Sequence, residues 1–145
     1  MRAAKLGPML RTSWKAHRFV LRASGGRLGS RLGGMQVLML ETTGRTSGQP
    51  RSVGLFFLEE GDSYYVAGSY SGEDRDPAWV KNLRAQPKAT VTVRGRAFPV
   101  LTRSLGGAER DAMFARFVQA DAAYGEYRER TSREIPVIEL LPEKA

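Results

Sequence analysis

From residue 35 onward, short apolar segments alternate with turns that contain glycine, proline or clustered charges. Residues 89–94 place small or branched apolar side chains at every second position, a period of two that predicts a strand with one buried face. The charged, glycine-containing segment 59–62 predicts a hairpin turn. Apolar runs bounded by turn residues predict further strands at 35–42, 53–58, 63–69, 97–104 and 135–141. Six strands with mostly short connections indicate a small antiparallel barrel or a sandwich, and the pattern leaves both open.

Three segments predict helices around this sheet. The first begins at Asp76, a preferred N-cap, followed by Pro77, which suits the first helical position, and it ends near Ala85. Residues 107–119 gather large apolar side chains on one helical face, and residues 122–130 predict a second, short helix. The predicted fold class is therefore mainly β with flanking helices, of the α+β type.

The first 34 residues differ from the rest of the chain. Residues 8–23 read as a helix with a narrow basic stripe and a broad apolar face that includes Trp14. Such a helix suits the interface of an anionic membrane, and it equally suits a helix packed on the domain with its basic edge in water. Residues 24–34 are rich in glycine and predict a flexible linker. The predicted organisation is an arm with its linker at 1–34 and one domain at 35–145.

Composition narrows the classes of function. The chain has 145 residues, 41% of them hydrophobic, which is enough for one folded domain. It has no cysteine and a single histidine, His17, which excludes a disulfide framework, a multi-histidine metal site and a Ser-His-Asp triad in the domain. The carboxylates are scattered, so no metal site is predicted. No apolar run approaches the ~20 residues needed to span a bilayer, and the N-terminus lacks the apolar stretch of a signal peptide, so we expect a cytoplasmic protein.

The net charge of +8 lies in the arm. Residues 1–40 contain eight basic residues and no acidic one, which leaves 15 of the 23 basic residues to balance the 15 acidic ones elsewhere. Such an arm attracts an anionic surface, and contact of residues 8–23 with the inner face of the plasma membrane is one expectation. Nucleic acid is not an expected partner, because the basic residues lack interleaved exposed aromatic side chains.

Two polar segments carry the candidate chemistry. Residues 43–51 form a glycine-punctuated loop in which Arg45 and Arg51 offer forked donors for a phosphate or a carboxylate. The competing interpretation is a loop between two strands whose arginines bind no ligand and are simply solvated. In the helix after Asp76, Trp79 and Asn82 share one face, which suits a planar heterocycle with polar edges. The competing interpretation is a tryptophan buried in the core under the helix.

The two segments read T-T-G-R-T-S-G-Q-P-R and D-P-A-W-V-K-N-L, and at this spacing they resemble the deazaflavin-dependent nitroreductase family, which binds coenzyme F420. The similarity runs from about residue 35 to about residue 141. It implies a split β-barrel of the FMN-binding-protein type. It also implies a reductase that transfers a hydride from reduced F420 to a quinone, a nitroaromatic compound or an activated alkene.

The resemblance also implies which residues form the site. The cofactor-binding residues would be Arg45, Thr46, Ser47, Arg51, Ser52, Val53, Gly54, Leu55, Phe56, Ala67, Gly68, Ser69, Tyr70, Ala78, Trp79, Val80, Lys81, Asn82 and Tyr124. Tyr124, Tyr127 and Ser69 would be the catalytic donors to a substrate oxygen. The chain departs from the family pattern at Asp121, where many members have a third tyrosine, and at Tyr70, which replaces a Lys or Asn.

Two other functions fit the same residues. An FMN-dependent reductase on the same barrel is one, since FMN also joins a phosphate to a planar ring. A basic protein that binds lipid or nucleic acid without catalysis is the other. The expected partners are a small-molecule hydride acceptor and a second copy of the chain in a homodimer.

Overall fold

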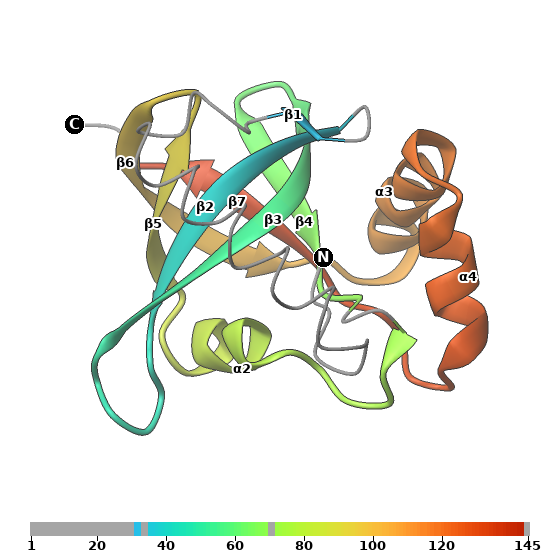
Figure 1. Ribbon diagram of the computed structural model, residues 1–145, viewed down its shortest axis with the longest axis horizontal. Coiled ribbons are helices and arrows are strands. Elements are labelled where there is room, and N and C mark those ends of the chain that lie inside the picture. The colour runs from blue at the N-terminus through green and yellow to red at the C-terminus, as the bar shows by residue number, and fades with distance from the viewer. Residues whose placement is uncertain (1–30, 33–34, 70–71, 144–145) are drawn as a thin grey trace.

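A computed structural model describes residues 31–32, 35–69 and 72–143 (Figure 1). The predicted arm helix at 8–23 and most of the linker lie outside the described residues, as does Tyr70. The elements follow one another as β1 (Arg31–Leu32), β2 (Met35–Thr43), β3 (Pro50–Glu60), β4 (Ser63–Ala67), α2 (Ala78–Ala85), β5 (Lys88–Val93), β6 (Arg96–Ser104), α3 (Gly107–Ala120), α4 (Ala123–Arg130) and β7 (Val137–Pro142).

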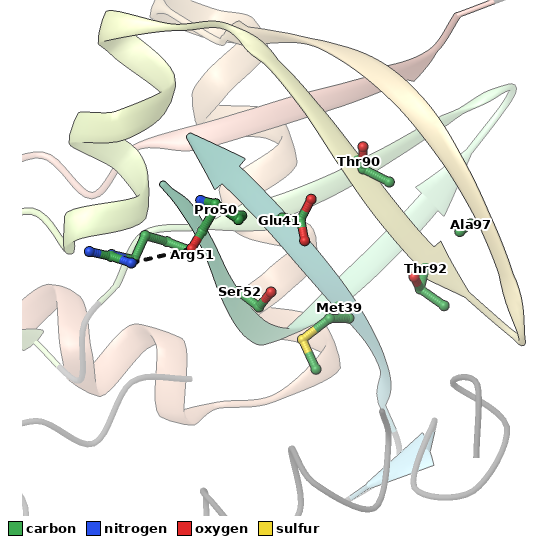
Figure 2. A pocket seen from close by; sticks show the side chains of 8 residues that line it. All are labelled: Met39, Glu41, Pro50, Arg51, Ser52, Thr90, Thr92 and Ala97. Carbon is green, nitrogen blue, oxygen red and sulfur yellow. Dashed lines mark hydrogen bonds between the residues drawn. The ribbon is translucent and has the colours of Figure 1, made fainter. Parts of the chain in front are cut away.

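The strands form one antiparallel sheet that closes on itself. Their order is β1-β2-β3-β4-β7-β6-β5, and β2 also pairs with β5, so β2 lies between β3 and β5 (Figure 2). The closing register joins Met39 to Thr92 and Leu40 to Val91. Six strands thus make the barrel, and the two-residue β1 is attached to β2. The sequence pattern left barrel and sandwich open, and the structure confirms the barrel that the family resemblance implies.

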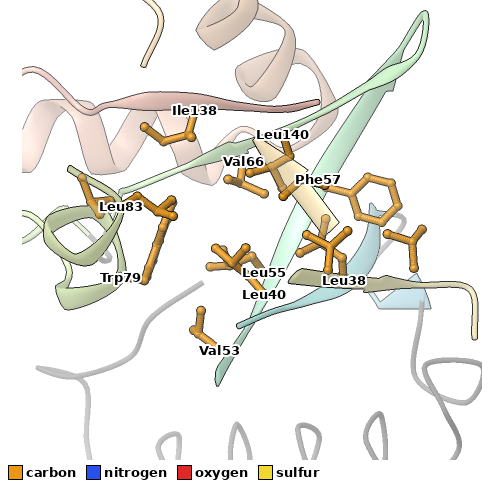
Figure 3. Close-up of a cluster of buried hydrophobic side chains, with 14 residues drawn as sticks. Leu38, Leu40, Val53, Leu55, Phe57, Val66, Trp79, Leu83, Ile138 and Leu140 are labelled. Atoms are coloured by element: carbon orange, nitrogen blue, oxygen red, sulfur yellow. The ribbon is translucent and has the colours of Figure 1, made fainter. Parts of the chain in front are cut away.

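The alternation of side chains along each strand fills the barrel. Every second residue of β2, β3, β5 and β7 points inward, and these residues form one apolar core (Figure 3). The inward residues of the strands are Leu38, Leu40, Val53, Leu55, Phe57, Val66, Val91, Val93, Val100, Ile138 and Leu140. The strict alternation predicted for residues 89–94 is confirmed, because Val91 and Val93 are buried in this core.

Helices cover one end and one side of the barrel (Figure 1). Helix α2 closes one end by inserting Trp79, Val80 and Leu83 into the barrel core. Helices α3 and α4 pack beside β4 and β7, where Phe114 and Phe117 of α3 join a second apolar cluster. None of the helices in the described ranges is both long enough and apolar enough to cross a membrane.

Several predicted boundaries differ from the structure, among them the strands predicted at 63–69 and 135–141, which are found at Ser63–Ala67 and Val137–Pro142. For two further boundaries the structure shows the physical reason. Strand β3 begins at Pro50 rather than Val53, because the β2–β3 ladder continues to the pair Thr43 and Pro50. Arg51 therefore lies on a strand and not in the loop. The N-cap of α2 is Pro77 rather than Asp76, and no side chain caps the helix. The carboxylate of Asp76 instead binds two arginines, which offer it charge-assisted hydrogen bonds.

Candidate functional site

The loop at residues 44–49 is held in shape by its own backbone. The amide of Gly44 donates to the carbonyl of Gln49 at 2.8 Å, and the amide of Gly48 donates to the carbonyl of Gly44 at 2.8 Å. A Cβ on Gly44 would lie 2.7 Å from Oγ of Ser47, and Gly48 has a φ of +72°, so both positions favour glycine. The loop is compact, while the side chains of Arg45, Thr46 and Ser47 are exposed.

Asn82 joins this loop to helix α2. Its Oδ1 accepts hydrogen bonds from the backbone amide of Arg45 at 3.1 Å and from Nη1 of Arg45 at 2.9 Å. Its Nδ2 donates to Oγ1 of Thr42 at 3.1 Å, and the residue is 3% exposed. Both acceptor positions of the oxygen are therefore used within the protein. The side chain orients Arg45, and its direct contact with a ligand ring stays a prediction.

Arg51 and Ser52 lie on β3 at the side of a groove on the outer surface of the barrel (Figure 2). The groove has a volume of about 850 Å³ and is lined by Met39, Glu41, Pro50, Arg51, Ser52, Thr90, Thr92 and Ala97. Nη2 of Arg51 donates to Oγ of Ser47 at 3.3 Å, and Figure 2 shows the guanidinium pointing away from the carboxylate of Glu41. The groove is large enough for a small organic ligand. The positive charge of Arg51 lies at the edge of the groove nearest the loop at residues 44–49.

Strand β3 links the loop to a second set of predicted residues. Val53 and Leu55 point into the barrel core, whereas Phe56 lies on the outer face and packs against the cluster that contains Tyr124. Arg51 and Phe56 are five positions apart on the extended strand, which corresponds to roughly 16 Å and places their side chains on opposite faces. Strand β3 therefore begins beside the exposed arginines, with Arg51 near its start and Arg45 in the loop before it, and further along it places Phe56 on the tyrosine cluster.

Tyr124 and Tyr127 meet edge to face on α4, with ring centroids 5.7 Å apart and an interplanar angle of 86°. Tyr124 is 2% exposed and also packs against Phe117 at 5.1 Å. Burial raises the pKa of the Tyr124 phenol well above its ordinary value. Burial, together with the nearby carboxylate of Asp121, raises the pKa of Tyr127. Both phenols stay protonated at neutral pH, so each is a hydrogen-bond donor.

The chain after β4 passes close to α2. Ala67, Gly68 and Ser69 are all buried, and the amide of Gly68 donates to the carbonyl of Pro136 at 2.8 Å. A Cβ on Gly68 would lie 2.7 Å from Cγ2 of Val80, so only a glycine allows this approach. Ser69 is 0% exposed, and its role as a donor to a substrate stays a prediction.

Trp79 is a core residue whose indole nitrogen lacks a hydrogen-bond partner. Its ring is 3% exposed within the barrel core, as the competing interpretation of the sequence predicts. Among buried side-chain nitrogens and oxygens of the described residues, Nε1 of Trp79 has no hydrogen-bond partner. An unsatisfied buried donor costs about 1–3 kcal/mol, so an acceptor placed beside this atom would be stabilising.

The other predicted site residues differ in how far their side chains are exposed to solvent. Ala78 of α2 is exposed, whereas Ser52, Phe56, Lys81 and Tyr127 are half-buried. Gly54 and Val80 are buried. The structure thus brings the predicted residues together as a loop with Asn82, an outer strand face, and a tyrosine cluster.

Sequence reasoning missed two parts of this region. The groove also takes Glu41, Thr90 and Thr92, which are polar residues at outward positions of predicted strands. The alternation of polar and apolar residues along each strand indicated that these side chains point outward. The pairing of β2 with β5, which brings them together, could not be predicted from the sequence. Arg133, whose guanidinium contacts the chain between β4 and α2, was also missed. Nothing in its local sequence distinguishes it from a solvated arginine.

Comparisons with known proteins show the family of the chain and similar solved folds. A sequence profile of the F420H(2)-dependent quinone reductases matches residues 13–142, which includes part of the predicted arm. An F420H(2)-dependent quinone reductase of Mycobacterium tuberculosis is 35% identical over 130 residues, which are 87% of this chain and 87% of that protein. The solved structure of an F420-H2 dependent reductase, FDR-A, has 33% identity and a TM-score of 0.66 over 72% of this chain and 92% of its own. A solved structure described as a domain-swapped dimer has 29% identity and a TM-score of 0.69 over 92% of this chain and 99% of its own. With a profile match over most of its length, the chain belongs to the F420H(2)-dependent quinone reductase family.

Proposed function

We propose that the protein is an oxidoreductase that takes a hydride from reduced coenzyme F420 and delivers it to a quinone. Family membership supports the cofactor and the reaction class. The observation that carries the proposal is the course of β3, which begins beside the exposed Arg45 and Arg51 and leads to Phe56, which packs on the cluster of Tyr124 and Tyr127. Coenzyme F420 joins a phosphodiester and an oligoglutamate tail to a planar ring, so it needs an anion site and a ring site at a distance from each other.

The residues present fit this cofactor. Arg45 and Arg51 are exposed and would hold the anionic tail through charge-assisted hydrogen bonds. Strand β3 would carry the middle of the molecule between these arginines and the tyrosine cluster. When bound, the reduced cofactor supplies the hydride from its ring carbon C5.

Tyr124 and Tyr127 supply the protein's part of the chemistry. A carbonyl oxygen of the acceptor gains negative charge as the hydride arrives, and a phenol hydrogen bond stabilises that charge or delivers the proton. The raised pKa of each phenol keeps the donor protonated. Nitroaromatic compounds and activated alkenes are further acceptors within this proposal. We expect bulky nitro compounds to be poorer acceptors than quinones, because Asp121 replaces a third aromatic donor.

The arm and the assembly belong to the same proposal. Eight basic residues before residue 41 would draw the protein to anionic lipid, which would bring it close to membrane quinones. A homodimer is supported by the similar solved structure that is described as a domain-swapped dimer.

A fluorescence titration tests the cofactor. We expect coenzyme F420 to bind at least tenfold more tightly than FMN. The Arg45→Ala and Arg51→Ala variants should each lose about 1–3 kcal/mol of binding free energy, the usual worth of a charge-assisted hydrogen bond. The loss should be smaller for a cofactor fragment without phosphate and glutamates. Arg116→Ala, on the exposed face of α3, is the control for loss of one positive charge. FMN binding as tight as F420 binding would overturn the cofactor assignment.

A further inference from the structure

Arg133, in the segment between α4 and β7, uses all three guanidinium nitrogens to hold the chain that joins β4 to α2. Nη2 donates to the carbonyl of Ser69 at 2.8 Å, Nε donates to the carbonyl of Glu73 at 2.7 Å, and Nη1 donates to Oδ1 of Asp76 at 2.8 Å. The side chain is 14% exposed. Because the fork is planar and rigid, three short contacts fix both ends of this connection relative to Arg133.

The same connection lies directly against α4. Gly72 has a φ of +78°, and its amide donates to the carbonyl of Ser69 at 2.8 Å. A Cβ on Gly72 would lie 2.8 Å from Cβ of Arg130 and 2.9 Å from the carbonyl oxygen of Tyr127. No side chain fits there, so the backbone of the connection touches the last turn of the helix that carries both tyrosines.

The charge of Arg133 is balanced within this contact. Burial lowers the pKa of Arg133, and the carboxylates of Asp76 and Asp74 oppose that shift, so the guanidinium stays charged at neutral pH. The second oxygen of Asp76 binds Nη1 of Arg84 at 2.6 Å. Arg84 has 53% of its side chain exposed. Arg84 therefore shares the carboxylate with Arg133 from the solvent side.

We propose that Arg133 is a positioning residue for hydride transfer. It holds the connection between β4 and α2, which is flanked by Ser69 and Trp79, two of the predicted site residues, at a fixed distance from Tyr124 and Tyr127. Hydride transfer needs its reacting atoms within about 3–3.5 Å, so a small displacement of one side of the site slows the reaction. This inference rests on the proposed function, and it adds a residue that touches neither cofactor nor substrate.

The test compares Arg133→Gln, Arg133→Lys and the control Arg84→Gln in the full-length protein. The readouts are the dissociation constant for F420 and the single-turnover rate of reduced F420 with a short-chain benzoquinone, both reactants saturating. Arg133→Gln should slow the turnover at least tenfold while the dissociation constant for F420 changes less than threefold, because the loop at residues 44–49 and Arg51 are untouched. The single-turnover rate of Arg133→Lys should lie between those of Arg133→Gln and the wild type, and it should be at least threefold lower than the wild-type rate. Arg84→Gln should stay within twofold of the wild type.

A purely structural role gives a different result. If Arg133→Gln lowers the melting temperature but its folded fraction turns over at the wild-type rate, the proposal is overturned. Should that variant fail to fold, a wild-type rate in Arg133→Lys overturns it as well.

Hydrogen exchange separates this inference from the proposed function. If the wild-type protein itself fails to oxidise reduced F420 with any quinone, the proposed function is wrong. In that event Arg133→Lys should still exchange the amides of residues 72–76 and of the last turn of α4 at least tenfold faster than Arg84→Gln. Unchanged exchange at both places would show that Arg133 does not couple them.

Discussion

Asn82 shows how a residue type that suits ligand recognition can instead orient a neighbouring side chain, here the proposed cofactor-binding residue Arg45. Its oxygen accepts two hydrogen bonds from Arg45, and its nitrogen binds Thr42. A carboxamide in this position transmits the placement of α2 to the loop at residues 44–49. Its contribution to cofactor binding should therefore pass through Arg45.

A double-mutant cycle measures this coupling. Asn82→Ala should weaken F420 binding at least fivefold, because the Arg45 guanidinium loses the acceptor that orients it. In the Arg45→Ala background the same change should have almost no further effect, whereas independent contacts would give additive losses. Gln86→Ala, at the exposed end of α2, is the control. Additive losses in the dissociation constant would mean that Asn82 contacts the cofactor itself.

Tyr124 and Tyr127 are the residues whose hydroxyl groups we propose as donors to the substrate. Tyr124→Phe and Tyr127→Phe keep the edge-to-face packing but remove the hydroxyl donors. At least one variant should lower the single-turnover rate tenfold or more, within the range of general acid catalysis, with little change in F420 affinity. Stopped-flow absorbance of the reduced cofactor measures the rate. Wild-type rates in both variants would leave the tyrosines as packing residues only.

At the scale of elements, glycines decide how closely α2 and α4 can approach their neighbours. Gly68→Ala would put a methyl group 2.7 Å from Cγ2 of Val80 and 3.0 Å from Cγ of Pro136. We expect it to destabilise the fold by about 1–3 kcal/mol, the usual cost of overpacking. Gly125→Ala is the matched comparison, because its Cβ would meet only Cγ1 of Val118 at an ordinary 3.5 Å. That variant should stabilise α4 by up to about 1 kcal/mol. Chemical denaturation would refute the packing argument if both variants moved stability in the same direction.

Local patterns predicted most elements because each depends on neighbours in sequence. The alternation at residues 89–94 and the apolar run before Pro142 depend only on side-chain periodicity, and both strands are present. The start of α2 was wrong because Asp76 is bound by Arg84 and Arg133, the latter 57 residues away along the chain. A preferred cap residue gives no sign that a distant arginine competes for its carboxylate.

The whole molecule sets the limits of what the sequence could reveal about the site. Barrel closure depends on β2 pairing with β5 across about 50 residues, and no short-range pattern encodes that pairing. The arginine loop and the α2 motif were recognisable because each is one continuous segment. The groove beside Arg51 and the contact of Arg133 with the β4–α2 connection arise only when distant segments meet. Residue-level motifs therefore identified the cofactor class, while the groove and the contacts of Arg133 became visible only in the fold.

At the scale of the whole molecule, the net positive charge is concentrated in the N-terminal arm. The eight basic residues before residue 41 account for the entire net charge of +8. Basic residues gain about 1 kcal/mol each near an anionic lipid surface. The full-length protein should therefore sediment with vesicles that contain anionic lipid at low salt, and rising salt should release it.

A charge variant isolates the cause. Changing Arg11, Lys15, Arg18 and Arg22 together to Gln removes the basic stripe and leaves residues 35–143 intact. This variant should lose most of its vesicle binding while it keeps its affinity for F420, because Arg45 and Arg51 are unchanged. A chain that begins at residue 31, and so retains β1, should behave in the same way. If the arm instead packs on the barrel, truncation will lower the melting temperature or the turnover rate. In that case vesicle binding by the full-length protein will be no stronger than binding by a neutral control protein.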